Sequence, residues 1–146
     1  MKAAERQLSL AQRKKWGMTL FFLDMDGLKY INDSHGHVEG DQALIETAAI
    51  LQKTVRQPDI IGRYAGDEFA VLAFETQRKS GTGDKISIRL RKNLDAYNAR
   101  RTPSKNLSLS IGIAYFDPKK PISIDELIDE ADVKMYEEKR AKRRAR

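Results

Sequence analysis

The chain has 146 residues, 40% of them hydrophobic and 33% charged, which is typical of one globular domain with its own core. It has no cysteine, so disulfides and thiolate zinc sites are excluded. No apolar run reaches the eighteen or so residues of a membrane span, and the charged N-terminus lacks the apolar segment of a signal peptide. We therefore expect a cytoplasmic domain that makes no contact with a membrane.

The formal net charge of +6 is concentrated at the C-terminus, where residues 139–146 contain six cations and no aromatic residue. A solvated helix end is the ordinary interpretation of such a run. Nucleic-acid binding is the remote alternative, because no aromatic platform or recognition helix accompanies the charge. We therefore expect no nucleic-acid partner.

In chain order, the pattern first predicts a helix over Ala3–Lys15 and a buried strand over Met18–Asp24, which ends in an acid. A short helix over Leu28–Ser34 follows the strand. The stretch Asp41–Arg56 repeats apolar residues at helical spacing, and Pro58 ends this longer helix.

Two β-prone runs, Ile60–Ala65 and Phe69–Phe74, flank a Gly-Asp turn and predict a hairpin. A loop at Lys79–Gly83 leads into a helix over Lys85–Asn98. The alternating run Leu107–Phe116 predicts a half-buried strand. Its expected inward side chains are Leu107, Leu109, Ile111 and Ile113.

The C-terminal region begins with Ser123-Ile124-Asp125-Glu126, which resembles a capping box and opens a helix to about Lys139. The chain has no internal repeat and no linker. We therefore expect a single α/β domain over residues 1–146.

Acidic residues stand out at two places: Asp24 at a strand end, and Asp67-Glu68 at the hairpin tip. Strand ends and turns tolerate carboxylates, so each has an ordinary structural explanation. Taken together, they are the residue types that hold a hard cation for phosphate chemistry. No Walker-type glycine-lysine loop is present, but the turn Asp26-Gly27-Leu28 offers free backbone N–H groups at a helix start.

Several segments together resemble, in order and spacing, the signature of the GGDEF domain family. These are Asp24–Asp33, Gly36-His37, Gly40-Asp41, Arg63–Phe69, Ser110–Gly112, Ala131-Asp132, Tyr136 and Lys139. The resemblance covers about residues 8–140. It implies an α+β fold in which helices flank a central, mostly antiparallel sheet, the palm-like fold of nucleotidyl cyclases.

The resemblance implies a diguanylate cyclase, a signalling nucleotidyltransferase that condenses two GTP into cyclic di-GMP and two pyrophosphates. By analogy, Asp24, Asp67 and the Met25 backbone carbonyl hold Mg²⁺, with Mn²⁺ as an alternative. Glu68 is expected beside the attacking 3′-hydroxyl or a second metal, so that Asp67 and Glu68 form the catalytic pair. One domain holds one GTP, so catalysis requires a transient homodimer about a twofold axis.

The resemblance also implies how GTP is bound. Asn32 and Asp41 match the guanine-contacting pair, and a carboxylate can accept from the adjacent N1–H and N2–H donors of guanine. Leu28 matches an apolar position near the base. Lys139 matches a phosphate-contacting lysine, and Lys29 adds a charge nearby.

A second motif, Arg56-Gln57-Pro58-Asp59, matches the RxxD site at which the family binds its product as an inhibitor. Arg56 can fork onto a guanine edge or a phosphate, and Asp59 can accept from guanine donors. The alternative is a helix-terminal arginine followed by a Pro-Asp turn. We favour the inhibitory site because the motif lies just upstream of the signature, at the offset expected from the resemblance.

Three departures from the family pattern matter. Ala65 replaces the first glycine of the signature, which costs roughly 1–2 kcal/mol if that position needs a positive φ and little if Gly66 takes that role. The usual Asp-x-Leu-Thr-Gly-Leu-x-Asn-Arg stretch does not precede the first helix, so we expect a fragment of a longer protein. A glycine usually found just after the Lys139 position is missing, and Arg143 is the candidate replacement for a phosphate contact.

The main rival is a catalytically silent GGDEF-like module that senses GTP or cyclic di-GMP. Such domains typically lose the metal or guanine residues, and all of those are present here. His35 and His37 suggest a metal site, but His37 is better explained as a structural part of the Gly-His turn.

Overall fold

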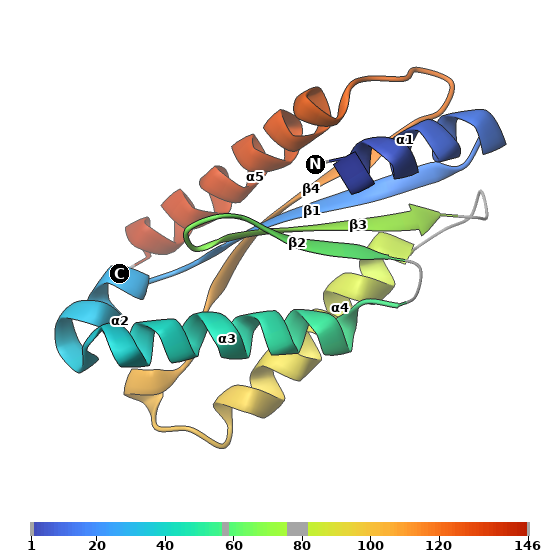
Figure 1. The fold of residues 1–146 in the computed structure, drawn as a ribbon. Coiled ribbons are helices and arrows are strands. Elements are labelled where there is room, and N and C mark those ends of the chain that lie inside the picture. The colour runs from blue at the N-terminus through green and yellow to red at the C-terminus, as the bar shows by residue number, and fades with distance from the viewer. Residues whose placement is uncertain (1, 57–58, 76–81, 146) are drawn as a thin grey trace.

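The computed structural model describes residues 2–56, 59–75 and 82–145 (Figure 1). Its elements, in chain order, are α1 (Lys2–Lys14), β1 (Gly17–Met25), α2 (Leu28–His35), α3 (His37–Thr54), β2 (Ile60–Ala65), β3 (Glu68–Glu75), α4 (Thr82–Asn98), the 3-10 turn η1 (Pro103–Lys105), β4 (Leu109–Phe116) and α5 (Ile124–Arg144). None of the helices in these ranges is long and apolar enough to cross a membrane.

The four strands form one sheet in the order β2-β3-β1-β4, and every neighbouring pair is antiparallel. The central strand β1 pairs Asp24 with Glu68 of β3 and with Ser110 of β4. The antiparallel sheet and its flanking helices confirm the predicted fold class. The register also brings the acidic end of β1 to the tip of the β2–β3 hairpin.

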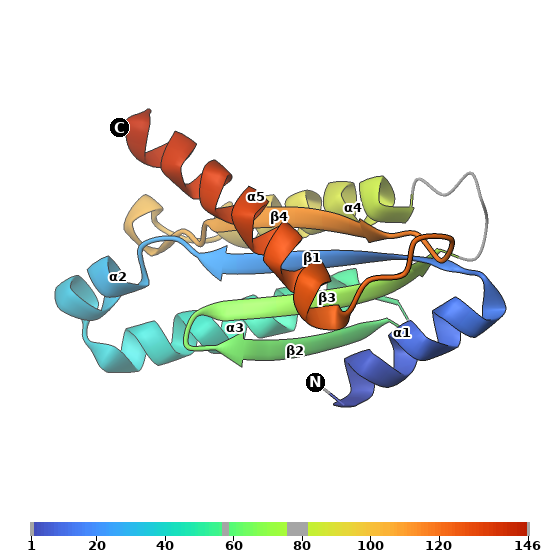
Figure 2. The ribbon, with the colours of Figure 1, turned by 90° about the horizontal axis from the view of Figure 1, so that it is seen from above.

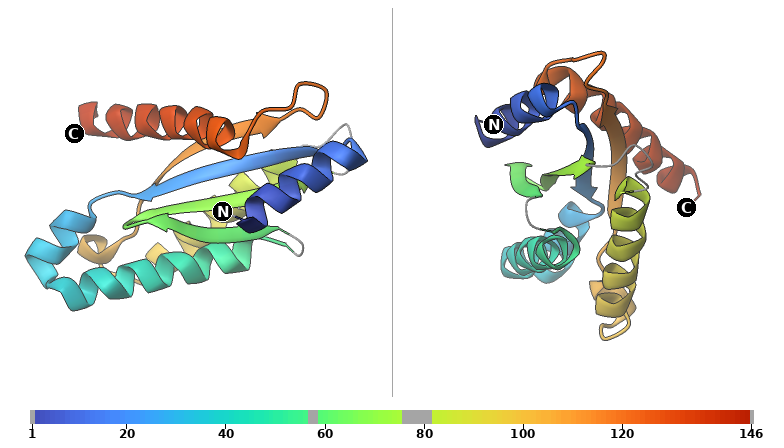
Figure 3. Two further views of the ribbon diagram at one scale, coloured as in Figure 1. Left: turned by 45° about the horizontal axis from the view of Figure 1, so that its top comes forward. Right: turned by 90° about the vertical axis from the view of Figure 1, so that its right-hand side faces the viewer.

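Helices cover both faces of the sheet: α1 and α5 lie on one face, and α3 and α4 on the other (Figure 1, Figure 3). Seen from above, α5 crosses the strands diagonally (Figure 2). Side chains of β1 alternate between the two cores, with Leu20 and Phe22 packed on the α1 and α5 side and Phe21 and Leu23 on the other. This double burial explains why β1 is a continuous apolar run.

The predicted inward face of β4 is wrong in part, because both faces of this strand are used. Ser110 and Gly112 are buried on the α5 side, Ile111 packs on the opposite core, and Ile113 is 36% exposed. A Cβ atom at Gly112 would collide with backbone atoms of α5, so this glycine permits the close approach of the helix. Alternating residues of β4 therefore face two different cores, and the face away from α5 is only partly buried.

Most predicted boundaries are confirmed to within a few residues. The helix α3 starts at His37, four residues earlier than predicted, and α5 extends to Arg144. Ser123 accepts a hydrogen bond from the Glu126 N–H at 3.1 Å, which confirms the capping box. Pro58 and most of the predicted loop at 79–83 lie outside the described residues, and α4 begins at Thr82 within that range.

Candidate functional site

The two acidic places predicted from the sequence meet at one end of the sheet. The Met25 N–H donates to the Asp67 backbone carbonyl at 3.1 Å, which joins the end of β1 to the hairpin tip. Asp24 lies opposite Glu68 in the antiparallel register. Residues more than forty positions apart in the chain are thereby placed side by side by strand pairing alone.

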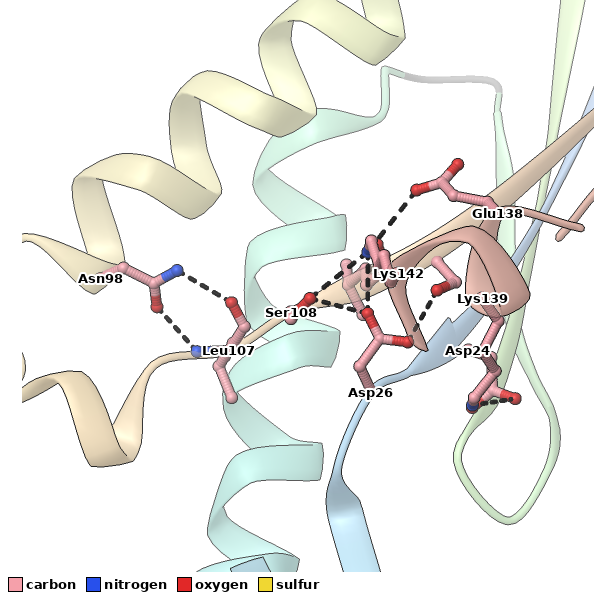
Figure 4. A network of polar contacts seen from close by, with 10 residues as sticks. Asp24, Asp26, Asn98, Leu107, Ser108, Glu138, Lys139 and Lys142 are labelled. Carbon is pink, nitrogen blue, oxygen red and sulfur yellow. Dashed lines mark hydrogen bonds and ion pairs between the residues drawn. The ribbon is translucent and has the colours of Figure 1, made fainter. Parts of the chain in front are cut away.

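Asp24 combines burial with an incomplete set of partners. Its Oδ2 lies 3.0 Å from Lys139 Nζ on α5, whereas Oδ1 is buried and has no hydrogen-bond partner among the described residues (Figure 4). Burial raises the pKa of Asp24 to about 6; Lys139 opposes this increase and the nearby Asp67 adds to it. An extra cation at this point would satisfy the free oxygen and favour the ionised form.

Glu68 is partly buried beside the same group of charges. Burial raises its pKa, the negative charges of Asp132 and Asp67 raise it further, and Lys139 opposes them. Asp132 lies in the family signature but was given no role from the sequence. Its influence depends on how α5 packs over the sheet, which sequence spacing does not reveal.

The donor set at this end of the sheet fits a hard cation that keeps part of its coordination for other ligands. Within the described ranges, no three histidine or acidic side chains converge into a complete metal-binding group. Asp24 and Asp67 provide two carboxylates next to strand-end backbone. Mg²⁺ is typically held by one or two carboxylates, with water and substrate phosphates at its remaining positions.

Asp26 lies next to this pair but is fully engaged by other groups. Its carboxylate accepts from Ser108 and Ser110, each at 2.7 Å, and from Lys142 at 2.8 Å (Figure 4). Burial alone would raise the pKa of Asp26, but these hydrogen bonds outweigh it and lower the pKa. From the sequence, Asp26 was predicted only as part of the signature and of the turn before the short helix, and spacing did not reveal this network.

The predicted guanine-contacting residues lie on two consecutive helices, Asn32 on α2 and Asp41 on α3. A Cβ atom at Gly40 would collide with the Asn32 side chain, so the glycine lets Asn32 pack against the first turn of α3. The next residue, Asp41, is exposed. Leu28 is partly buried against the core on the α3 and α4 side, and Lys29 is exposed on α2.

Asp41 also lies at a groove of about 430 Å³ between α3 and β2. Apolar side chains, including Leu44, Ile61 and Phe69, form much of its wall. Asn32 and Leu28 are not part of the lining, so the structure joins Asp41 to this groove and Asn32 to the α2–α3 junction.

Arg56 and Asp59, the two ends of the RxxD segment, are hydrogen-bonded to each other just after α3. The Asp59 N–H donates to the Arg56 carbonyl at 2.7 Å, and the Asp59 carboxylate accepts from the Arg56 N–H at 3.0 Å and from its Nε at 3.4 Å. The Asp59 side chain is fully buried, whereas that of Arg56 is 46% exposed. Gln57 and Pro58 lie outside the described residues. The buried Asp59 carboxylate therefore orients an arginine side chain that is about half exposed.

The alanine in the signature sits in an unstrained position. Gly66 has φ 39°, whereas Lys15 is the one non-glycine residue with positive φ among those described. Gly66 therefore takes the left-handed position of the hairpin tip, and Ala65 ends β2 in extended backbone. Of the two alternatives for Ala65, the structure therefore supports the one with little backbone cost.

A comparison of the sequence with protein families identifies the domain. The family described as diguanylate cyclase, GGDEF domain, matches residues 1–145. The chain belongs to the GGDEF family. The expected resemblance is thereby confirmed over nearly the whole chain.

Relatives of this GGDEF domain carry different names. The chain is 36% identical to the probable diguanylate cyclase DgcC of Escherichia coli, over 86% of this chain and 33% of that protein. It is 30% identical to the diguanylate cyclase DgcP of Escherichia coli, over 93% of this chain and 39% of that protein. It is also 32% identical to the cyclic di-GMP phosphodiesterase NbdA of Pseudomonas aeruginosa, over 84% of this chain and 15% of that protein. The domain spans about a third of the length of the two cyclase relatives.

Solved structures agree with the fold. The GGDEF domain of PA1120 (TpbB or YfiN) from Pseudomonas aeruginosa superposes with a TM-score of 0.81 at 31% identity, covering 96% of this chain and 81% of that one. A microbial GGDEF domain studied for its interaction with cyclic di-GMP superposes with a TM-score of 0.77 at 31% identity, again covering 96% of this chain and 81% of that one. These similarities confirm the palm-like fold.

Proposed function

We propose that this GGDEF domain is a diguanylate cyclase that condenses two GTP into cyclic di-GMP and two pyrophosphates. The observation that carries the proposal is the meeting of Asp24 and Asp67 at the end of β1 beside Lys139. The relatives named as diguanylate cyclases support the same chemistry.

Asp24, Asp67 and the Met25 backbone carbonyl would hold Mg²⁺ or Mn²⁺. When bound, the ion supplies positive charge that stabilises the phosphates of GTP during phosphoryl transfer. The free Oδ1 of Asp24 supports this assignment, because a buried carboxylate oxygen without a partner is costly. Lys139 contributes the cationic charge nearest to Asp24 and is proposed as a phosphate contact.

Glu68 is proposed to act at the attacking 3′-hydroxyl, as a base or as a ligand of a second ion. Its raised pKa brings the carboxylate closer to the range in which a general base works well near neutral pH. The 3′-oxygen of one GTP attacks the α-phosphorus of the other, and pyrophosphate leaves. A second, equivalent step closes the ring, so two copies of the domain must face each other.

Asn32 and Asp41 are proposed to read guanine, with Leu28 near the base and Lys29 near the phosphates. Adenine lacks the N1–H and 2-amino donors, so its N1 acceptor would face the Asp41 carboxylate. An unpaired, desolvated carboxylate costs on the order of 2–4 kcal/mol, or roughly 30- to 1000-fold in discrimination.

The wild type should therefore make cyclic di-GMP almost alone from an equal mixture of GTP and ATP, and Asp41→Ser should allow ATP to compete as a substrate. Substantial mixed product from the wild type would refute this role.

The metal assignment is tested with Asp67→Asn, which keeps the side-chain volume and removes the charge. Asp95→Asn is the matched control, because Asp95 is an exposed acid on α4 away from the site. We expect Asp67→Asn to lower cyclic di-GMP formation by about 10²- to 10³-fold, the scale seen when one group that stabilises transition-state charge is removed. Unchanged turnover in Asp67→Asn would contradict the assignment. Nucleotide binding by the wild type without any turnover would instead support the sensor alternative.

We further propose that Arg56 and Asp59 bind the product as an inhibitory site. The half-exposed Arg56 side chain supports contact with a guanine edge or phosphate, while the buried Asp59 orients it. Calorimetry should detect cyclic di-GMP binding that Arg56→Ala removes and Arg100→Ala, an exposed arginine after α4, leaves intact. Equal affinity in the two variants would leave the segment as an ordinary turn.

A further inference from the structure

The C-terminal turn of α5 carries a lysine whose hydrogen-bonding capacity is fully used. Lys142 Nζ lies 2.6 Å from the Leu109 carbonyl, 2.8 Å from Asp26 Oδ2 and 3.3 Å from Ser108 Oγ (Figure 4). An ammonium group has three N–H donors, so these three acceptors account for all of them. Glu138 adds a weaker electrostatic contact at 3.5 Å. Lys142 therefore has no donor left for a ligand in this arrangement.

The position of Lys142 follows from two similar spacings, that of Asp24 and Asp26 along the backbone and that of Lys139 and Lys142 along α5. Asp24 lies in β1 and Asp26 directly follows the strand, and two residues of extended backbone span about 6–7 Å. Lys139 and Lys142 are three residues apart on α5, about 4.5 Å along the helix axis and on one helix face. Two parallel ion pairs result, Lys139 with Asp24 and Lys142 with Asp26.

The two acids differ in what their partners leave free. In Asp26, Oδ1 accepts from Ser110, Oδ2 accepts from Ser108 and Lys142, and the side chain is only 9% exposed. In Asp24, Oδ1 has no hydrogen-bond partner among the described residues. The Asp26 N–H also donates to the Ser108 carbonyl at 2.8 Å. Asp24 is thus available to a ligand, whereas Asp26 is held by the protein.

We propose that Lys142 is a positioning residue that links α5 and β4 to Asp26 and so fixes the turn from Asp26 to Leu28. This turn leads into α2, whose first backbone N–H groups are free and form a seat for anions such as nucleotide phosphates. The inference therefore rests on the proposed function, in which GTP binds at this end of the sheet. Lys142 acts through Asp26 and does not contact the nucleotide. The link joins residues 116 positions apart, so it exists only in the folded domain.

The first test needs no nucleotide. Lys142→Met keeps the aliphatic stem and removes the ammonium group. Lys134→Met is the matched control, because Lys134 also donates from α5 to a β4 carbonyl, that of Ile113 at 3.0 Å, away from Asp26. We expect amide hydrogen exchange of Asp26 to become at least about tenfold faster in Lys142→Met, because a local link that opposes opening is lost. Unchanged exchange in Lys142→Met, or equal acceleration in both variants, would overturn the inference.

The second test separates positioning from direct contact through a double-mutant cycle. The probe is a GTP analogue with a non-cleavable α,β-methylene link, added with Mg²⁺ and measured by calorimetry. Lys142→Met and Asp26→Asn should each weaken binding by about tenfold or more, because misplaced groups lose much of their effect. The double variant should be no weaker than either single one, because both remove one link. Full affinity in Asp26→Asn with a loss only in Lys142→Met would mean direct contact and would overturn the inference.

Two further results keep this inference separate from the proposed cyclase activity. Lys142→Arg preserves the charge and several donors and should restore most of the affinity, whereas a role in folding alone would leave the affinity of folded Lys142→Met unchanged. If the cycle shows the expected coupling but the wild type makes no product from GTP, the cyclase proposal fails and the positioning role stands. If the wild type makes cyclic di-GMP and Lys142→Met binds the analogue normally, the positioning role fails alone.

Discussion

At the scale of single residues, the hairpin tip depends on which of two adjacent positions needs a glycine. Gly66 has φ 39°, in the left-handed region, while Ala65 ends β2 in extended backbone. An L side chain in the left-handed region is strained by its Cβ atom, and glycine avoids that strain. The signature therefore keeps its shape with alanine at the first position.

Gly66→Ala should lower the free energy of unfolding by about 1–2 kcal/mol, the cost of placing a Cβ atom in left-handed backbone. Ala65→Gly should lower it by less than about 1 kcal/mol, through added flexibility of the unfolded chain. Urea denaturation of both variants measures the difference. An Ala65→Gly domain clearly more stable than the wild type would show that Ala65 is strained.

The Lys142–Asp26 pair predicts a dependence of stability on pH. The pKa of Asp26 is lowered from its ordinary value of 3.8, so the folded domain releases this proton more readily than the unfolded chain. The contribution is complete above the unfolded pKa and is lost as pH falls through the folded pKa. Lys142→Met should therefore reduce stability at pH 7 by about 1–2 kcal/mol, the scale of a partly exposed charged hydrogen bond.

Urea denaturation of the wild type and Lys142→Met at pH 7 and at pH 2 tests this dependence. The difference between the two proteins should be smaller at pH 2, because protonation of Asp26 becomes more favourable as the pH falls toward its lowered pKa. An undiminished difference at pH 2 would show that the ion pair with Asp26 is not its source.

At the scale of the elements, β4 and α5 pack closely because Gly112 has no side chain. A Cβ atom there would collide with the backbone of Ala131 and Met135, which cannot move independently of the helix. Gly112→Val should lower the free energy of unfolding by about 3 kcal/mol or more, above the usual range for overpacking, since backbone atoms must shift. The control is Gly62→Val on β2, where no atom lies within 4 Å of the Cβ position. Equal losses in the two variants would contradict this explanation.

Periodicity predicted the elements well but not how they are covered. The strand β1 and the acids at its end and at the hairpin tip follow from apolar runs and turn residues, which are local signals. The inward face of β4 was misassigned in part because helices cover both faces of the sheet, so alternation no longer separates core from solvent. The early start of α3 was missed because Gly36 and Gly40 lower helix propensity, while packing of Asn32 on Gly40 favours the helix.

The contacts of Lys142 and Asp132 could not be predicted from sequence spacing. The last helix was expected to end at about Lys139, whereas α5 continues to Arg144 and thereby brings Lys142 to Asp26. Asp132 influences Glu68 because α5 lies over the sheet, a tertiary arrangement that no local pattern specifies. Sequence reasoning thus found the acids of the site but missed part of what holds or perturbs them.

At the scale of the whole molecule, the proposed reaction needs two copies. The large exposed apolar side chains of the described residues are spread over several elements, including Val38 on α3, Ile88 on α4 and Val133 on α5. This distribution favours a mostly monomeric chain that pairs transiently. Activity per mole of domain at fixed GTP should therefore rise with protein concentration. Constant specific activity of a monomeric preparation over about a hundredfold range would contradict dimer-dependent catalysis, since dimer population follows mass action.

In the proposed reaction, this domain itself joins two GTP molecules. The most direct measurement is chromatography of the products after the wild-type chain is incubated with GTP and Mg²⁺, with pyrophosphate quantified in the same sample. We predict cyclic di-GMP with two pyrophosphates released for each product molecule, and no product when Mg²⁺ is chelated. Unchanged GTP at high protein concentration, or conversion to GDP and phosphate, would contradict the account.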